Sequence, residues 1–283
     1  MWAAAGHERR SSRASVAMPF RTSSAGSEAN TCSMVRAGRA ARKGQSSRIP
    51  NSLLRRTVVV DAGEVAFATC GSGPALLVPW CNVPWPDLPV VDRLAQQYLV
   101  VLASPRGYQY SSRLSSDQDY GMETSAHDLI AVCDALGAAE FAVLGYSLTA
   151  VLAGWLACTS SRVTFAVLGG FPLLGSYARV SRAAERDVAQ LSTDPGFDTR
   201  AALALYRDLA ELPDGRLIDD RRCPVHVFWG SADTVLQGFD VTAGLDDALT
   251  ARGVSTSIVD GADHVTTLLD TDAIIRAVAT GAR

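Results

Sequence analysis

Lysine is almost absent from this 283-residue sequence, which has 25 arginines and a single lysine, Lys43. Residues 57–283 contain no lysine and only three histidines. Few side chains there can serve as a general base, because that role falls mostly to histidine and less often to lysine. Cysteine is also scarce, and no two of the six cysteines lie within four residues of each other. This spacing excludes CxxC redox or zinc motifs and predicts reduced, mostly buried thiols.

Acidic residues are rare at the N-terminal end. Residues 1–56 hold eleven basic side chains and two acids, a net charge of +9, whereas residues 57–283 carry a net charge of −12. Nucleic acids need clustered Lys and Arg, so the acidic body argues against such a partner. A body of about 227 residues in a chain that is 48% hydrophobic can bury one core as a single domain.

Residues 1–55 are predicted to be a basic, disordered N-terminal extension. No apolar stretch of about 7–15 residues follows the first arginines, which argues against a secretory signal peptide. The Arg- and Ser-rich, acid-poor composition also resembles an organelle transit peptide, and a start codon placed too far upstream is a further alternative. For the functional chain we expect a cytoplasmic location.

Strand and helix patterns alternate through residues 56–283, the predicted globular domain. Strands are expected at 57–60, 64–69, 75–78, 98–103, 141–144, 163–168, 225–229 and 255–259, and helices at 87–97, 124–136, 148–158, near 241–251 and from about 271. This alternation predicts an α/β fold with a mostly parallel sheet, helices on both faces and an antiparallel edge formed by the first two strands.

Two stretches depart from this rhythm. Residues 172–220 contain two helical segments around a turn at 192–196. Residues 141–159 carry no charge and approach the length of a membrane span. Gly145-Tyr146-Ser147 interrupts that run, so we interpret it as a buried strand followed by a buried helix, which is normal beside a parallel sheet.

The sharpest local pattern is Leu144-Gly145-Tyr146-Ser147-Leu148-Thr149. A strand leads into a helix through a turn with Ser147 at its apex, which is typical of a nucleophile elbow. Such a turn exposes the serine hydroxyl above the sheet and directs the next N–H, that of Leu148, at the reacting oxygen. Serine is a weak nucleophile alone and needs an adjacent base.

His264 is the candidate base. It lies in the predicted loop after the last strand, whereas His226 lies in a strand pattern and His127 in a helix, where packing or a solvated face explains them. Asp233 lies just past the preceding strand, where it can orient the imidazole and stabilise its cation. Taken alone, Asp233 also fits an ordinary turn or helix cap.

With these segments in order, the chain resembles the α/β-hydrolase superfamily over about residues 57–283. The resemblance rests on the elbow G-Y-S-L-T, the segment W-G-S-A-D after a strand and G-A-D-H near the end. It implies that Ser147, Asp233 and His264 are nucleophile, acid and base. It also implies a small helical lid inserted at about 172–220.

Three positions depart from the family pattern. Thr149 replaces the usual second glycine of the elbow, and Ser104 stands where many members have Asp. The usual His-Gly after the third strand is replaced by Pro79-Trp80-Cys81-Asn82. Pro79 has no N–H to donate, and losing one oxyanion donor costs about 10²–10³ in rate.

The oxyanion hole is therefore expected to use the backbone N–H groups of Leu148 and Cys81, with the side chain of Asn82 as an alternative donor. Trp80 and Tyr146 are expected to line the substrate pocket with Asn82, although core packing explains Trp80 equally well.

The favoured hypothesis is a serine hydrolase, carboxylesterase, lactonase or thioesterase-like, that forms an acyl-enzyme on a small-molecule substrate. The missing His-Gly leaves open a cofactor-free lyase, a carbon–carbon bond hydrolase or a perhydrolase on the same fold, because fold does not fix chemistry. A catalytically impaired binding protein is the remaining alternative.

No cofactor is expected. The sequence shows no metal-ligand cluster, and Gly71-Ser72-Gly73 lacks the Lys-Ser/Thr of a phosphate loop. We expect a small-molecule substrate, no nucleic-acid or membrane partner, and leave the oligomeric state open.

Overall fold

A single eight-stranded sheet forms the centre of the computed structural model, which describes residues 54–61, 63–81, 83–190, 196–238 and 244–283. The strand order is β1-β2-β4-β3-β5-β6-β7-β8. Neighbours among β1, β2 and β4 are antiparallel, and every later pair is parallel. The strands are β1 (Leu54–Val60), β2 (Gly63–Cys70), β3 (Ala75–Pro79), β4 (Leu99–Ser104), β5 (Phe141–Tyr146), β6 (Val163–Gly169), β7 (Val225–Gly230) and β8 (Ser255–Val259).

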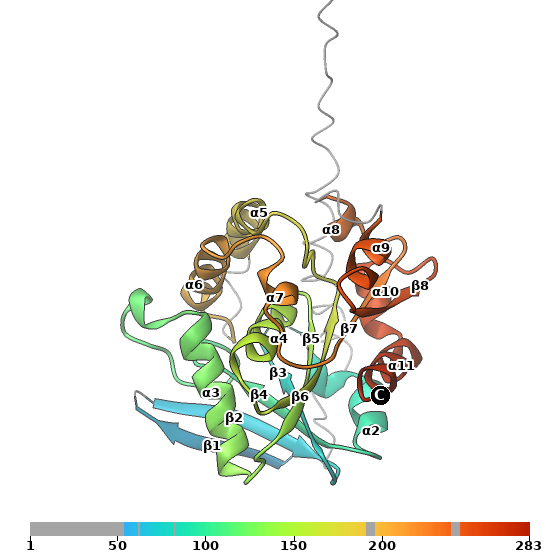
Figure 1. Ribbon diagram of the computed structural model, residues 1–283. Helices are drawn as coiled ribbons and strands as arrows, with labels where there is room; N and C mark the ends of the chain where they lie inside the picture. The colour runs from blue at the N-terminus through green and yellow to red at the C-terminus, as the bar shows by residue number, and fades with distance from the viewer. Residues whose placement is uncertain (1–53, 62, 82, 191–195, 239–243) are drawn as a thin grey trace, which may run out of the picture.

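Helices cover both faces of this sheet (Figure 1). They are α2 (Pro89–Leu94), α3 (Met122–Ala135), α4 (Leu148–Thr159), α5 (Tyr177–Gln190), α6 (Thr199–Ala210), α7 (Arg216–Asp219), α8 (Thr234–Gln237), α9 (Leu245–Thr250), α10 (His264–Leu269) and α11 (Thr271–Gly281), with the 3₁₀ turns η1 (Trp85–Asp87) and η2 (Asp117–Asp119).

The alternation of side chains along each strand divides the core into two layers. Leu77 of β3 packs in one buried cluster with Leu129 of α3 and Leu152 of α4. Its neighbour Leu76 faces the other way and packs with Ile274 of α11 and with α2. The predicted α/β fold, with a mostly parallel sheet, helices on both faces and an antiparallel edge, is therefore confirmed.

His264 was expected in a loop, and the structure instead makes it the first residue of α10. Asp263 caps this helix, and a helix of six residues is too short to leave a readable periodic pattern in the sequence. The same reason explains why α8 was not predicted. The helix predicted at 87–97 forms as the shorter α2, with the 3₁₀ turn η1 just before it, and each element has a proline in its first turn.

Helices α5, α6 and α7 occupy the stretch expected to form a lid. Figure 1 shows α5 and α6 beside each other above the sheet, and the Ser181 hydroxyl of α5 donates a hydrogen bond of 2.7 Å to the Tyr206 carbonyl of α6. Of the turn predicted at 192–196, residues 192–195 lie outside the described residues. The function of these helices as a lid stays a prediction.

The uncharged run predicted as strand plus helix forms β5 and α4. In the part of the chain that the structure describes, no helix combines the length and apolar character needed to cross a bilayer.

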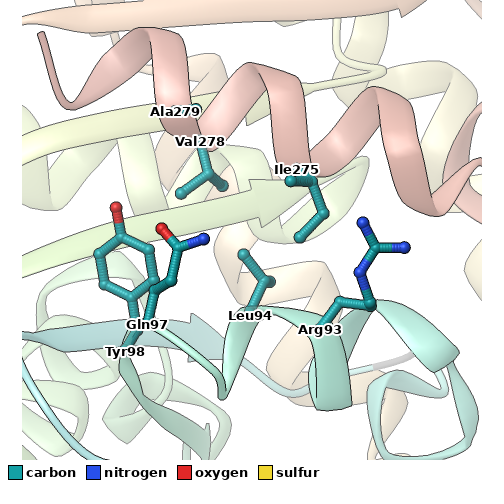
Figure 2. A pocket seen from close by; sticks show the side chains of 7 residues that line it. All are labelled: Arg93, Leu94, Gln97, Tyr98, Ile275, Val278 and Ala279. Atoms are coloured by element: carbon teal, nitrogen blue, oxygen red, sulfur yellow. The ribbon is translucent and has the colours of Figure 1, made fainter.

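The parallel strands β3, β5, β7 and β8 end at one edge of the sheet, and the predicted site residues follow those ends. Ligands of open α/β sheets bind at this edge. Figure 2 shows a hollow elsewhere, between α11, α2 and the turn after α2. Its volume of about 40 Å³ is little more than that of one water molecule, and it contains no predicted site residue.

Candidate active site

Ser147 occupies the sharp turn between β5 and α4, with φ 55° and ψ −126°. This conformation costs a non-glycine residue about 1–3 kcal/mol and persists only where its surroundings impose it. Here the Ser147 N–H donates to the Gly169 carbonyl at 2.8 Å. Gly145 permits the close approach of α4, because a Cβ at Gly145 would lie 2.3 Å from the Thr149 carbonyl oxygen. The half-buried Ser147 is thus held in the geometry of a nucleophile elbow.

Thr149, which replaces the usual second glycine, braces this turn. Its hydroxyl accepts a hydrogen bond from the Tyr146 N–H and donates one to the Tyr146 carbonyl, both at 2.9 Å. The side chain is fully buried. The departure from glycine is therefore accommodated by two hydrogen bonds that join the first turn of α4 to the end of β5.

Asp233 lies beyond β7 and caps α8. One carboxylate oxygen, Oδ1, accepts hydrogen bonds from the N–H groups of Val235 (3.0 Å) and Leu236 (3.2 Å). The Ala232 N–H donates to the Ala262 carbonyl at 2.9 Å, which joins the loop after β7 to the loop after β8. The fully buried Asp233 therefore faces the segment that carries the candidate base.

His264 pairs with Asp233: its Nδ1 lies 2.8 Å from Asp233 Oδ2, and the histidine is itself buried. The adjacent Asp263 does not compete, because its carboxylate accepts hydrogen bonds from the N–H groups of Thr266 and Val265 at the start of α10. The Thr266 N–H and hydroxyl are the main groups that lower the Asp263 pKa below its usual value. The structure therefore brings Asp233 and His264 together, and their roles as acid and base stay a prediction.

Tyr146 contacts His264 through both its hydroxyl and its ring. Its hydroxyl donates to the His264 carbonyl at 2.6 Å, and the two ring centroids are 5.2 Å apart. Burial raises the Tyr146 pKa well above its usual value, so this hydroxyl stays protonated. A Cβ at Gly170 would lie 3.0 Å from His264 Cε1, and Gly169 accepts the Ser147 N–H. Ser147 and His264 therefore each contact one of the two adjacent glycines at the end of β6.

Tyr146 is fully buried, and its contacts are those of a support for His264. The pocket-wall role expected for Tyr146 stays a prediction. The Trp80 ring, 7% exposed, packs edge-on against Tyr110 with centroids 5.7 Å apart. Asn82, the third predicted pocket residue and alternative oxyanion donor, lies outside the described residues. The pocket itself stays a prediction.

The two expected oxyanion donors follow the ends of two adjacent strands, β5 and β3. Leu148 is the first residue of α4, where helical N–H groups have no intrahelical partner. Cys81 follows β3, which pairs with β5. Among the residues that the structure describes, none accepts a hydrogen bond from either N–H. Their role as oxyanion donors stays a prediction.

The segment around Cys81 is held by its neighbours. The Trp80 N–H donates to the Ala103 carbonyl at 2.7 Å, and the Ser104 hydroxyl donates to the Trp80 carbonyl at 2.6 Å. The side-chain amide of Gln109 donates to the Cys81 carbonyl. The Cys81 thiol is wholly buried, and burial raises its pKa far above the usual value, which argues against a reactive thiolate.

The other two histidines of the body have structural surroundings. His226 is buried in β7, with its ring nitrogens 2.9 Å from the hydroxyls of Ser255 and Ser257, and burial lowers its pKa to about 4. His127 is exposed on α3, 3.5 Å from Glu123. These surroundings agree with the explanations that the sequence favours, packing for His226 and a solvated helix face for His127.

Sequence reasoning missed the supporting residues of this site. The sequence indicates Tyr146 only as a pocket wall, and Ser104 only as a departure from a family pattern. The positive φ of 45° at Gln109 and the contact of Gly170 with His264 leave no signal in the sequence, because both depend on segments brought together by folding.

Comparison with known proteins identifies the fold. The sequence model of a family described as alpha/beta hydrolase fold matches residues 70–168. An epoxide hydrolase from Vigna radiata aligns with a TM-score of 0.63 and 16% identity, over 82% of this chain and 98% of its own. A hydrolase from Pseudomonas aeruginosa aligns with a TM-score of 0.61 and 19% identity, over 82% and 98%. An enol-lactonase from Burkholderia xenovorans aligns with a TM-score of 0.60 and 16% identity, over 80% and 98%. None of the curated proteins compared with the sequence matches it.

Proposed function

We propose that this protein, a member of the α/β-hydrolase superfamily, is a serine hydrolase that cleaves a small ester, lactone or thioester through an acyl-enzyme. The observation that carries the proposal is the buried His264–Asp233 pair, with 2.8 Å between Nδ1 and Oδ2. It is joined by a serine in a strained elbow, whose N–H donates to the Gly169 carbonyl, next to the Gly170 that faces His264. An enol-lactonase and a thioesterase domain are among the solved structures with the same fold.

In this mechanism Asp233 accepts the Nδ1 proton of His264 in a hydrogen bond and leaves Nε2 unprotonated. Nε2 takes the proton of the Ser147 hydroxyl as its oxygen attacks the substrate carbonyl. The developing oxyanion receives hydrogen bonds from the N–H groups of Leu148 and Cys81. Its position at the N-terminus of α4 adds the favourable end of the helix dipole.

Collapse of the tetrahedral intermediate breaks the bond to the leaving group, which receives the proton from His264. Water then attacks the acyl-enzyme while His264 again accepts a proton, and Ser147 is released with the carboxylic acid. The buried Asp233 stabilises the imidazolium in both steps.

The test is a panel of small esters, lactones and thioesters, with labelling by a fluorophosphonate. We expect wild type to turn over one of these classes and to be labelled at Ser147. Ser147→Ala should lose both, with turnover lower by about 10⁴-fold or more. Ser160→Ala, at the opposite end of α4, is the matched control and should behave as wild type.

Folded wild type that is neither labelled nor active on the panel would overturn the proposal. Turnover that survives in Ser147→Ala would favour chemistry without an acyl-enzyme, such as a cofactor-free lyase.

A further inference from the structure

The Trp80–Cys81 peptide group is anchored on one side only. Its carbonyl oxygen, on Trp80, accepts a 2.6 Å hydrogen bond from the hydroxyl of Ser104, the last residue of β4. The Trp80 N–H continues the β3–β4 pairing by donating to Ala103. Ser104 is wholly buried, so water cannot replace its hydroxyl easily.

This anchor sets the direction of the Cys81 N–H. In a trans peptide the C=O and the following N–H point to opposite sides, and the described chain has no cis peptide. The sheet order is β4-β3-β5, so β3 lies between the strand that carries Ser104 and the strand that leads to Ser147. A Trp80 carbonyl directed at β4 leaves the Cys81 N–H directed toward β5 and its elbow.

We propose that Ser104 is a positioning residue for the oxyanion hole: its hydroxyl holds the Trp80–Cys81 peptide so that the Cys81 N–H faces the oxygen that develops charge at Ser147. The inference rests on the proposed hydrolase function. Two of the sequence departures, Ser104 and the segment 79–82, are therefore in direct contact. An ionised carboxylate at position 104 could not donate this hydrogen bond.

The hydrogen bond also polarises the peptide. Accepting a hydrogen bond at the carbonyl oxygen makes the N–H of the same peptide a stronger donor. Gln109 adds a second anchor, because its side-chain amide donates to the Cys81 carbonyl while its backbone N–H donates to the Gly196 carbonyl at 2.6 Å. Cys81 is thus held on both sides of the N–H that the oxyanion would use.

Ser111 provides a matched control within the same network. It is also buried, and its hydroxyl accepts the Ala66 N–H at 2.8 Å and donates to the Ser104 carbonyl. Among the hydrogen bonds of the described residues, none joins the Ser111 hydroxyl to the Trp80–Cys81 peptide. Ser104→Ala and Ser111→Ala each remove one buried hydroxyl, but only the first frees the proposed oxyanion donor.

The experiment measures kcat, KM and the affinity for a trifluoromethyl ketone, which forms a tetrahedral adduct with a catalytic serine. Ser104→Ala should lower kcat about tenfold with little change in KM, less than the ~10²–10³ for loss of a whole donor. Inhibitor affinity should fall by the same factor, because that adduct carries the oxyanion. Ser104→Thr, which keeps the hydroxyl, should restore both, and Ser111→Ala should leave both near wild type.

Equal kcat and inhibitor affinity in Ser104→Ala and Ser111→Ala would overturn the inference while leaving the hydrolase function intact. A wild type that is neither active nor labelled overturns the function and the inference together. If Ser104→Ala does not fold, Ser104→Cys, which is similar in size and a weak donor, takes its place with the same expected losses.

Discussion

Replacing Asp233 by Asn should separate the two tasks of its carboxylate. Oδ1 caps α8 by accepting the N–H groups of Val235 and Leu236, and Oδ2 pairs with His264 Nδ1. In Asp233→Asn the amide oxygen can keep the cap while the NH₂ group faces Nδ1. Because NH₂ donates, Nδ1 must become an acceptor and the imidazole proton moves to Nε2, where it prevents uptake of the Ser147 proton.

The magnitudes follow from these contacts. The wrong tautomer should lower kcat about 10⁴-fold, which corresponds to roughly 5 kcal/mol of transition-state stabilisation. Stability should change little, because a retained Asn cap is nearly as good as Asp. Asp233→Ala loses the cap, worth about 1 kcal/mol, and leaves the buried His264 N–H without a partner, for a further ~1–3 kcal/mol.

The assay combines kcat on an active member of the ester panel with the free energy of unfolding in urea, for wild type, Asp233→Asn and Asp233→Ala. We expect both variants to be inactive and only the alanine variant to be strongly destabilised. An Asn variant with kcat within about tenfold of wild type would refute the proposed tautomer argument. An Asn variant as unstable as the Ala variant would refute the capping argument.

Three further predictions concern residues around the elbow and one buried histidine. Thr149→Val should lower the free energy of unfolding by about 2 kcal/mol, because the N–H and carbonyl of Tyr146 lose a buried partner; urea unfolding measures it. Gly170→Ala should lower kcat by up to about 10²-fold, because φ is +59° and the new Cβ would meet the Tyr146 and His264 rings; steady-state kinetics measures it. The His226 pKa is lowered from 6.5 to about 4 in the folded chain, so the unfolded chain binds a proton first. The contribution of neutral His226 to the free energy of unfolding is therefore full above about pH 6.5. It is lost as the pH falls toward 4, by up to roughly 3 kcal/mol. His226→Gln should flatten that slope in urea unfolding against pH.

Each of these predictions has a matched control. Thr149→Ser keeps the hydroxyl and should retain stability; equal loss in Ser and Val would contradict the hydrogen-bond argument. Gly137→Ala places a Cβ at a similar φ of +68° with nothing within 4 Å, so it isolates backbone strain and should leave kcat unchanged. A Gly170→Ala enzyme as active as wild type would show that His264 tolerates the contact. His127→Gln should keep the wild-type pH slope, and an equal slope in the His226 variant would exclude that residue as its source.

The sheet was predictable because each buried parallel strand carries its own apolar run. β5 and α4 separate at the residues that interrupt the uncharged stretch. The edge strand β8 is only partly buried and starts with three polar residues, yet it too begins and ends at the predicted residues. Short helices were not predictable. The side chains of Asp233 and Asp263 cap the starts of α8 and α10, but an Asp at such a position fits an ordinary turn equally well in the sequence.

The candidate site was partly predictable for a similar reason. Ser147 is marked by a local turn, and the scarcity of histidine and the absence of lysine in the body narrowed the choice of base to His264. Their supports were not predictable, because Tyr146 reaches the His264 carbonyl across 118 residues of sequence and Ser104 reaches Trp80 across 24.

By itself, the sequence determined the fold class, the order of the strands along the chain and the three candidate residues Ser147, Asp233 and His264, since local periodicity and residue chemistry carry that information. Only the tertiary structure decided that Asp233 Oδ2 meets His264 Nδ1, that the Tyr146 hydroxyl donates to the His264 carbonyl, and that the Ser104 hydroxyl donates to the Trp80 carbonyl. The physical reason is that hydrogen bonds join whichever groups the packed strands bring within 3 Å, and no local pattern specifies those distances.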